Sequence, residues 1–391
     1  MIIVSLNVYD SHKKLGGISM KKKKLIACIA AIAMVGSLFV GCGAQSTSGS
    51  GTSDKKQIRA GLATDDGGIN DKSFNQSANK GLKIAEKELG IESKAIESKS
   101  KENYVQNLQL ISQDFDADLT FAVGYQMKKA LEDVSTQVKD KKFAIIDAVV
   151  EKPNVISLLF KEQEGSFLTG VIAAKMTKTN KIGFIGGNES EVIGRFEAGY
   201  IAGAKSVNPN IKIERRYAES FTDSNKGYEL AKVEYNSGCD IVMHAAGGAG
   251  LGLFQAASEL KKTGKNVWAI GVDMDQVLSL LDSNGKPQYA DIILTSMVKK
   301  VDVATVEAIK EVKEGTFKAG IKTFGLKENG VCIAPSSRGE VPDNMKQYVK
   351  SNVPKDIIEL SDKYAEAIKS GKIVVPSTPK EALEFKGVSL K

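Results

Sequence analysis

Acidic and aromatic residues stand directly after short apolar runs at several places in this chain of 391 residues. The first apolar run ends in the segment TDDGGINDKSFNQ, which contains Asp65, Asp66, Phe74 and Asn75. Carboxylate and amide oxygens accept hydrogen bonds from the N–H and O–H groups of a small polar molecule. Phe74 is flanked by polar residues, so its ring is better suited to stacking on a flat ligand than to a core. The segment predicts one wall of a ligand site, although helix capping and turn formation would explain the same residues.

Two further carboxylates follow apolar segments that have the composition of buried strands. Asp147 follows FAII, and Asp273 follows WAIGV, with Asp275 two residues later. A carboxylate is costly to bury without a partner, so we expect both aspartates to face solvent or a cleft. Either one alone could be a surface cap. Two aspartates at similar strand ends favour a shared ligand role.

A glycine-rich turn offers backbone groups to the same site. Gly247 and Gly248 lie in HAAGGAGLG, where free backbone N–H groups could bind a polar ligand. The turn lacks the lysine and hydroxyl residue of a Walker motif, and His244 before it is expected to be a satisfied strand-end histidine. The remaining candidates are two aromatic residues, Phe196 and Phe221, and one of two adjacent lysines, Lys299 or Lys300.

The composition argues against several other kinds of protein. The chain has only two histidines and no CxxC motif, so neither a zinc site nor a histidine-based catalytic triad is expected. Cys239 and Cys332 could form a disulfide, but two buried thiols are the favoured interpretation. The net charge of +7 looks basic, yet residues 1–41 contain six lysines and a single acid. The rest of the chain is close to neutral, so nucleic acid is not an expected partner.

The start of the chain has the pattern of a lipoprotein signal. From Met20 the sequence reads MKKKK, followed by an apolar run that ends at Cys42. We predict a signal peptide at 20–41, lipidation of Cys42 and a flexible linker at 42–56. Phe39 stands where such signals usually have leucine, and an uncleaved anchoring helix is the alternative. Residues 1–19 fit no signal pattern and are expected to be an over-extended start.

Short apolar runs alternate with amphipathic segments from residue 58 onward, which predicts an α/β fold with parallel strands. The expected strands are 58–63, 93–96, 119–123, 143–147, 155–159, 181–186, 212–217, 241–244 and 267–272. The expected helices are 75–89, 104–114, 126–138, 166–176, 196–207, 225–237, 252–262, 301–313 and 354–370. Two such blocks, divided near residue 160, predict two lobes. Ligands bind beyond the carboxyl ends of such strands, so the candidate residues should meet in a cleft between the lobes.

Six segments together resemble the basic membrane protein family of bacterial lipoproteins, whose characterised members include purine nucleoside receptors of ABC transporters. The segments are TDDGGINDKSFNQSANKG, FAIIDAVV, RFEAGYIAGAK, HAAGGAGLG, WAIGVDMDQ and ILTSMVKKVDVA, in this order within residues 57–335. Membership implies the type I periplasmic-binding-protein fold, with two doubly wound α/β lobes joined by three crossover strands. On this basis we assign 57–160 and 296–317 to lobe I, and 161–295 and 318–391 to lobe II.

The resemblance also implies a role for each candidate residue. Phe74 and Phe221 would sandwich a purine base, while Asp65, Asp66 and Asp147 would bind its edge. Asp273 would bind ribose hydroxyls with Lys299 and the backbone of Gly247 and Gly248, and Asn75 and Phe196 complete the predicted set. Carboxylates favour a nucleoside over a nucleotide because they repel phosphate.

We therefore expect a monomeric, lipid-anchored receptor on the extracytoplasmic face of the cell membrane. It would bind a purine nucleoside without cofactor or metal and deliver it to an ABC permease. Three alternatives remain open: a receptor for a sugar or an autoinducer, a regulatory lipoprotein without a transport partner, and an enzyme such as a nucleoside hydrolase. Adjacent aspartates could act as bases in such an enzyme, but no further carboxylate recurs nearby at metal-ligand spacing, so a binding protein is favoured.

Overall fold

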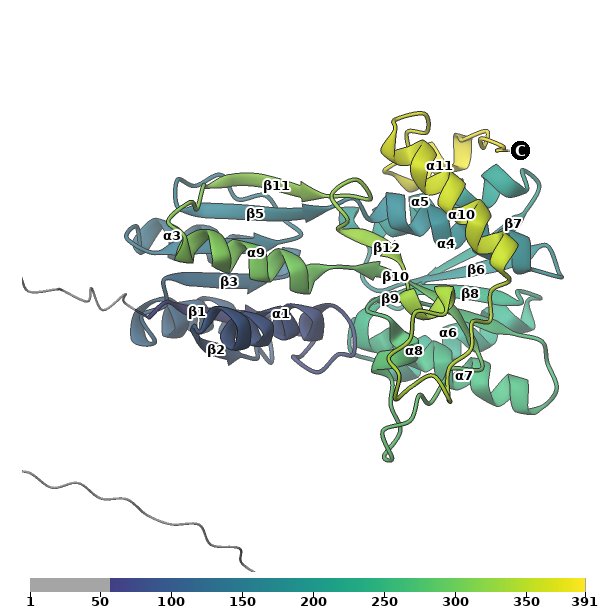
Figure 1. Cartoon of the computed structure of the whole chain (residues 1–391), viewed down its shortest axis with the longest axis horizontal. Helices are drawn as coiled ribbons and strands as arrows, with labels where there is room; N and C mark the ends of the chain where they lie inside the picture. The colour runs from purple at the N-terminus through teal and green to yellow at the C-terminus, as the bar shows by residue number, and fades with distance from the viewer. Residues whose placement is uncertain (1–56, 391) are drawn as a thin grey trace, which may run out of the picture. The chain divides into compact units, whose positions relative to one another are not determined.

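The computed structural model describes residues 57–390 (Figure 1). The predicted signal peptide, the lipidation site at Cys42, the linker at 42–56 and residues 1–19 lie outside the described residues. Within 57–390, no helix is both long and apolar enough to cross a bilayer. The described chain contains two six-stranded sheets with helices on both faces, which confirms the predicted α/β fold of two doubly wound lobes.

The first sheet has the strand order β11-β5-β4-β3-β1-β2, and all its strands run parallel. Its strands are β1 (Arg59–Thr64), β2 (Glu92–Ile96), β3 (Leu119–Val123), β4 (Lys142–Ile146), β5 (Val155–Phe160) and β11 (Gly320–Phe324). Helices α1 (Phe74–Leu89) and α9 (Val301–Lys313) lie side by side over one face of this sheet (Figure 1). The other face is covered by α2 (Tyr104–Gln109), continued by a π-turn (Leu110–Asp114), and by α3 (Lys128–Gln137).

The second sheet repeats this arrangement in the order β12-β10-β9-β8-β6-β7, with only the edge strand β12 antiparallel. Its strands are β6 (Lys181–Gly186), β7 (Lys212–Tyr217), β8 (Ile241–Ala245), β9 (Trp268–Asp273), β10 (Ile293–Lys299) and β12 (Val331–Ile333). Its helices are α4 (Glu162–Met176), α5 (Glu191–Val207), α6 (Ser224–Asn236), α7 (Leu251–Lys262), α8 (Gln276–Ser279), α10 (Lys355–Lys369) and α11 (Pro379–Glu384). Helices α4 and α5 cover one face of the sheet, and α6 and α7 cover the other.

The chain passes between the two sheets three times: from β5 into α4, from β10 into α9, and from β11 into β12. These three crossovers are those expected for the type I periplasmic-binding-protein fold. Sheet membership differs from our expectation at two places. We assigned 296–317 to lobe I, but β10 pairs with β9 in the second sheet up to Val298. We assigned 318–391 to lobe II, but β11 lies at the edge of the first sheet, where it forms backbone hydrogen bonds with β5.

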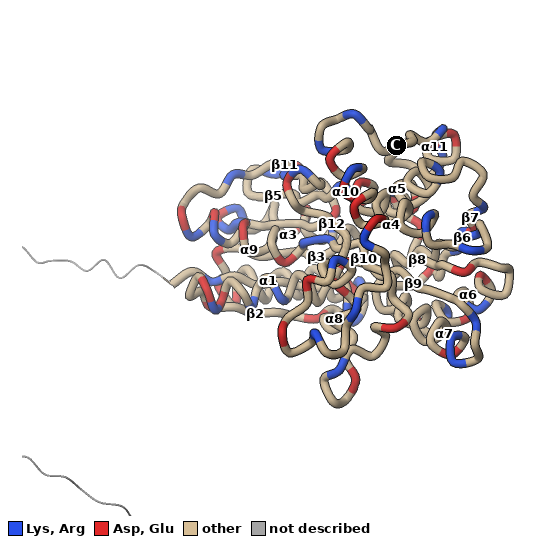
Figure 2. Tube along the Cα trace, turned by 45° about the vertical axis from the view of Figure 1, so that its right-hand side comes forward, with Lys and Arg blue, Asp and Glu red and all other residues tan. Residues whose placement is uncertain are grey.

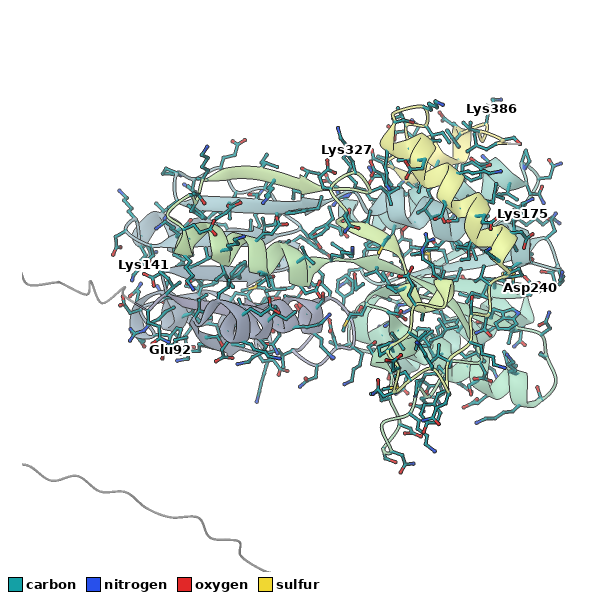
Figure 3. All side chains as sticks on the ribbon, viewed as in Figure 1. Glu92, Lys141, Lys175, Asp240, Lys327 and Lys386 are labelled. Carbon is teal, nitrogen blue, oxygen red and sulfur yellow. The ribbon has the colours of Figure 1, made fainter. Side chains whose placement is uncertain are left out.

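The carboxyl ends of the strands in the two sheets are directed toward one another. Glu92 and Lys141, at or just before the starts of β2 and β4, mark the end of the first sheet that is remote from the second (Figure 3). Asp240, just before β8, lies toward the opposite end (Figure 3). Acidic and basic residues are interspersed over both sheets and their helices (Figure 2). Loops that follow the strands are therefore the ones that can build a shared site.

Helices α4 and α5 are held in close contact by small residues. A β-carbon at Gly203 would lie 1.9 Å from the carbonyl oxygen of Phe167, and one at Gly199 would lie 2.2 Å from that of Gln163. The two glycines lie in the segment RFEAGYIAGAK, so this motif serves helix packing as well as the site. Ser190 caps α5 by accepting a hydrogen bond from the backbone of Ile193, so the helix begins earlier than the expected residue 196.

Candidate ligand-binding site

A cavity lies beyond the carboxyl ends of the strands and is lined by residues of both sheets. Of the eleven predicted ligand-binding residues, all except Asp66 and Gly248 line it. The lining residues are Asp65, Gly67, Asp71, Phe74, Asn75, Gly124, Tyr125, Asp147, Val192, Ile193, Phe196, Phe221, Ala245, Gly247, Val272, Asp273 and Lys299.

The loop after β1 forms the first wall of the cavity. Asp65 accepts hydrogen bonds from the backbone of Gly67 at 3.0 Å and from the Asn75 side-chain amide at 2.7 Å. Because Asp65 is buried, its pKa rises to about 6. Asp71 caps α1 by accepting from three backbone N–H groups, and burial raises its pKa to about 7. Asp71 was not among the predicted ligand-binding residues, but it lines the cavity.

Asp66 does not reach the cavity, in contrast to the prediction. Its carboxylate accepts a hydrogen bond from the side-chain amide of Gln126 at 2.9 Å, and its backbone N–H donates to the Tyr104 hydroxyl at 3.2 Å. Asp66 lies in the turn that follows β1, and these two partners hold it away from the cavity. Asp275 is also engaged elsewhere, because it accepts from the backbone and hydroxyl of Ser336.

Asp147 and Asp273 occupy matching positions in the two sheets. Each stands at the carboxyl end of the fourth strand counted from the β2 or β7 edge, and each has a left-handed backbone, with φ of 70° and 62°. Aspartate tolerates this conformation better than most residues. The bend turns both carboxylates into the cavity, so the predicted pairing of strand-end aspartates is present. The hydroxyl of Ser73 donates to Asp273 at 2.5 Å, which links the first loop to the second sheet.

Lys299 is the one cation that lines the cavity within residues 57–390. Its side chain is only 1% exposed, and its ammonium contacts both carboxylate oxygens of Asp147 at 2.5 and 2.6 Å. Burial opposes its charge, but Asp147, Glu162 and Asp273 together raise its pKa. Lys300, the alternative candidate, is instead bound to the side chain of Asn329. Of the two lysines, Lys299 is the one that lines this cavity.

Glu162 and Arg195 extend this charge pair away from the cavity, and neither was predicted. Glu162 is fully buried, contacts the Lys299 ammonium at 2.9 Å and accepts from the Arg195 guanidinium at 2.6 Å. Burial alone would raise the pKa of Glu162, but Lys299 and Arg195 lower it below the ordinary value. Among residues 57–390, Lys299 is the one hydrogen-bond donor to the side chain of Asp147, and burial raises the pKa of Asp147 to about 6. A segment such as KEQEGS carries no sequence signal that its first glutamate is buried.

The aromatic residues of the cavity come from both sheets. Phe74 and Phe221 are half-buried and face the cavity from the α1 side and from the loop after β7. A β-carbon at Gly187 would lie 2.2 Å from the Phe221 ring, so this glycine leaves room for the ring. Phe196 is 3% exposed and belongs to the core around α5, although its edge reaches the cavity. Tyr125 also lines the cavity, and the strand-end rule applied to β3 would have found it.

The residues that the sequence left ambiguous have structural roles. His244 is fully buried, its Nε2 lies 2.9 Å from the Gln276 side chain, and burial lowers its pKa to about 4. It therefore remains neutral and packs edge-on against Phe254. The expectation of a fully satisfied histidine is met only at Nε2, because Nδ1 is buried without a hydrogen-bond partner among residues 57–390. Cys239 and Cys332 are free thiols, as the favoured interpretation expected, but only Cys239 is buried and Cys332 is half-buried.

The fold and the cavity define a class of protein. Two α/β lobes joined by three crossovers, with one polar and aromatic cavity between them, form a solute-binding protein of the type I periplasmic fold. A solute-binding protein of an ABC transporter from Aeropyrum pernix K1 has a similar structure, with a TM-score of 0.69, 28% identity, and coverage of 83% of this chain and 95% of that chain.

Sequence comparisons identify the family. Residues 58–373 match the family Bmp, described as ABC transporter substrate-binding protein PnrA-like. The chain is 37% identical to a CD4+ T-cell-stimulating antigen of Listeria innocua, over 92% of this chain and all of that protein. It is 36% identical to the ABC transporter nucleoside-binding protein BmpA of Lactococcus lactis, over 91% of this chain and 99% of that protein. The chain therefore belongs to the Bmp family of ABC transporter substrate-binding proteins.

Membership defines the general activity of the chain. It is a binding protein and not an enzyme, it takes a small-molecule ligand, and its partner is a transporter. Substrate-binding proteins of this class work outside the cytoplasm.

Proposed function

We propose that this protein captures a purine nucleoside in the cavity between its two sheets and delivers it to an ABC permease. The observation that carries the proposal is the pairing of two half-buried rings, Phe74 and Phe221, from opposite sheets around a carboxylate-rich cavity. Two aromatic faces suit a flat base, since stacking of a base on an aromatic side chain is worth about 1–3 kcal/mol. The naming of the Lactococcus lactis relative as a nucleoside-binding protein supports the same ligand class.

The charges of the cavity favour a nucleoside over a nucleotide. Four carboxylates, those of Asp65, Asp71, Asp147 and Asp273, line it together with the single ammonium of Lys299. Carboxylates accept hydrogen bonds from base N–H groups and sugar hydroxyls, but they repel a phosphate. In this proposal the base edge faces Asp65 and Asn75. The ribose hydroxyls lie near Asp273 and Lys299, with backbone contacts at Gly247.

Isothermal titration of the purified protein with nucleosides, free bases, nucleotides and sugars tests the ligand class. We expect binding of guanosine, inosine or adenosine and at least tenfold weaker binding of the corresponding monophosphates. Binding of a sugar with no response to any nucleoside would refute the proposal.

We also propose that Cys42 carries the lipid that holds the protein at the outer face of the cell membrane. The proposal rests on the basic start, apolar run and cysteine of residues 20–42. Labelling of producing cells with a radioactive fatty acid tests it, and Cys42→Ser should abolish both the label and retention in the membrane fraction. A labelled Cys42→Ser protein would show that the anchor lies elsewhere.

A further inference from the structure

Four charged side chains form a continuous row that begins in the cavity and ends outside it. Asp147 binds Lys299, Lys299 binds Glu162, and Glu162 binds Arg195, with contacts of 2.5, 2.9 and 2.6 Å. The first three side chains are at most 5% exposed, whereas that of Arg195 is 21% exposed. Buried charges require partners, so each carboxylate here is balanced by a cation.

Most of the donor capacity of the Lys299 ammonium is taken by Asp147 while this row is intact. A lysine ammonium has three N–H donors. Two are hydrogen-bonded to the carboxylate oxygens of Asp147. Glu162 Oε1 lies 2.9 Å from the ammonium as an ion-pair partner, but it accepts no hydrogen bond within residues 57–390. A ligand that displaces Asp147 therefore leaves Glu162 as the carboxylate beside the ammonium.

Asp147 is the partner that the ligand can replace. It lines the cavity, and within residues 57–390 its carboxylate accepts hydrogen bonds from Lys299 alone. A ligand hydroxyl could donate a hydrogen bond to one oxygen of Asp147 and accept a hydrogen bond from one N–H of Lys299. Glu162 is fully buried and bound from its other side by Arg195, so it stays in place during this exchange.

We infer that Glu162, fixed by Arg195, is a positioning residue that holds the Lys299 ammonium charged and directed into the cavity when the ligand takes Asp147. The inference rests on the proposed nucleoside function, in which Lys299 contacts a ribose hydroxyl. Glu162 is the first residue of α4 and Arg195 lies on α5, and the glycine contacts between these helices keep the pair rigid. The positive end of the α4 dipole further stabilises the carboxylate of Glu162.

The test compares inosine, 2′-deoxyinosine and 3′-deoxyinosine by titration of the full chain and its variants. We expect Glu162→Gln to weaken inosine at least tenfold and to weaken one deoxy analogue less than twofold, because that analogue lacks the hydroxyl that Lys299 binds. Arg195→Met should have the same selective effect, and adding it to Glu162→Gln should weaken inosine no further. Glu164→Gln is the matched control on the same helix turn, since Glu164 contacts Lys161 and the backbone of Leu326 instead.

A pH profile separates positioning from a purely structural role. The Glu162→Gln protein should lose inosine affinity several-fold between pH 7.5 and 9.5, because Lys299 then loses its proton more readily, while the wild type stays constant. Equal weakening of all three ligands with an unchanged pH profile would overturn the inference. If Glu162→Gln does not fold, the affinities of Arg195→Met for the three ligands distinguish positioning from a structural role in the same way. Failure of the wild type to bind any nucleoside would instead refute the proposed function.

Discussion

Replacement of Phe221 by alanine should separate ligand binding from stability. Phe221 lies in a loop, is half-buried and faces the cavity, so its ring is available to a base. Loss of one stacking face costs about 1–3 kcal/mol, which corresponds to roughly a 5- to 150-fold weaker affinity. Because the ring is half-buried and packs only against the edge of the core, the free energy of unfolding should fall by about 1 kcal/mol.

Phe196→Ala provides the contrasting result. Phe196 is 3% exposed and packs into the core around α5, so its removal leaves a cavity. Phe-to-Ala changes of this kind cost about 3–5 kcal/mol of folding free energy. We expect a large loss of stability for Phe196→Ala and a smaller loss of affinity than for Phe221→Ala.

The assay combines isothermal titration with a purine nucleoside and urea unfolding of the ligand-free protein. Phe115→Ala is a matched control, because Phe115 is also half-buried but does not line the cavity. A Phe221→Ala protein that binds as tightly as the wild type would refute the sandwich geometry. A loss of stability as large as that of Phe196→Ala would show that Phe221 is a core residue.

Three further predictions concern charge and packing. Lys299→Met removes the cation between two buried carboxylates and should lower the free energy of unfolding by about 3–5 kcal/mol at pH 7, measured in urea. This loss of stability should be smaller at pH 5, where Asp147 is protonated. A loss of stability that does not depend on pH would contradict this prediction. Nucleoside affinity should fall as the pH drops from 7.5 to 5, because Asp65 and Asp147 have pKa values raised to about 6 and lose their acceptor charge. Raised pKa values favour the protonated folded state, so these two groups stabilise the ligand-free protein more at pH 5 than at pH 7.5. As the pH falls, calorimetry should therefore show a lower affinity for the nucleoside, while unfolding of the ligand-free protein should show the contribution of these two groups to stability increasing. Gly250→Ala should destabilise the second lobe, since a β-carbon there would lie 1.8 Å from Nδ1 of His244; thermal unfolding equal to that of the wild type would refute this.

Much of the local structure could be predicted from the sequence. The strands 119–123, 181–186 and 212–217 and the helix 301–313 were expected at the bounds that the structure has. Residues 119–123 and 181–186 form apolar runs of strand length and residues 301–313 carry a helical repeat, and such patterns depend only on neighbouring residues. A second local rule, polar residues after strands, located Asp65, Asp147 and Asp273 in the cavity lining.

Choices between neighbouring residues required the tertiary structure. Asp65 lines the cavity and Asp66 does not, and Lys299 lines it while Lys300 does not. Asp66 lies in the turn after β1 and is held by Gln126 and Tyr104, and Lys300 follows the end of β10 and contacts Asn329. These partners come from distant parts of the chain, so the sequence alone does not identify them.

The sequence by itself determined that this chain has two α/β lobes with acidic and aromatic residues after their strands, because periodicity and strand-end composition are local properties. Only the tertiary structure decided that β11 joins the first sheet, because either sheet offered an edge to such a short strand. It also decided that Glu162 and Arg195 act on Lys299. In the sequence they are ordinary helix charges, and they become partners only because α4 and α5 pack closely and bury them beside the end of β10.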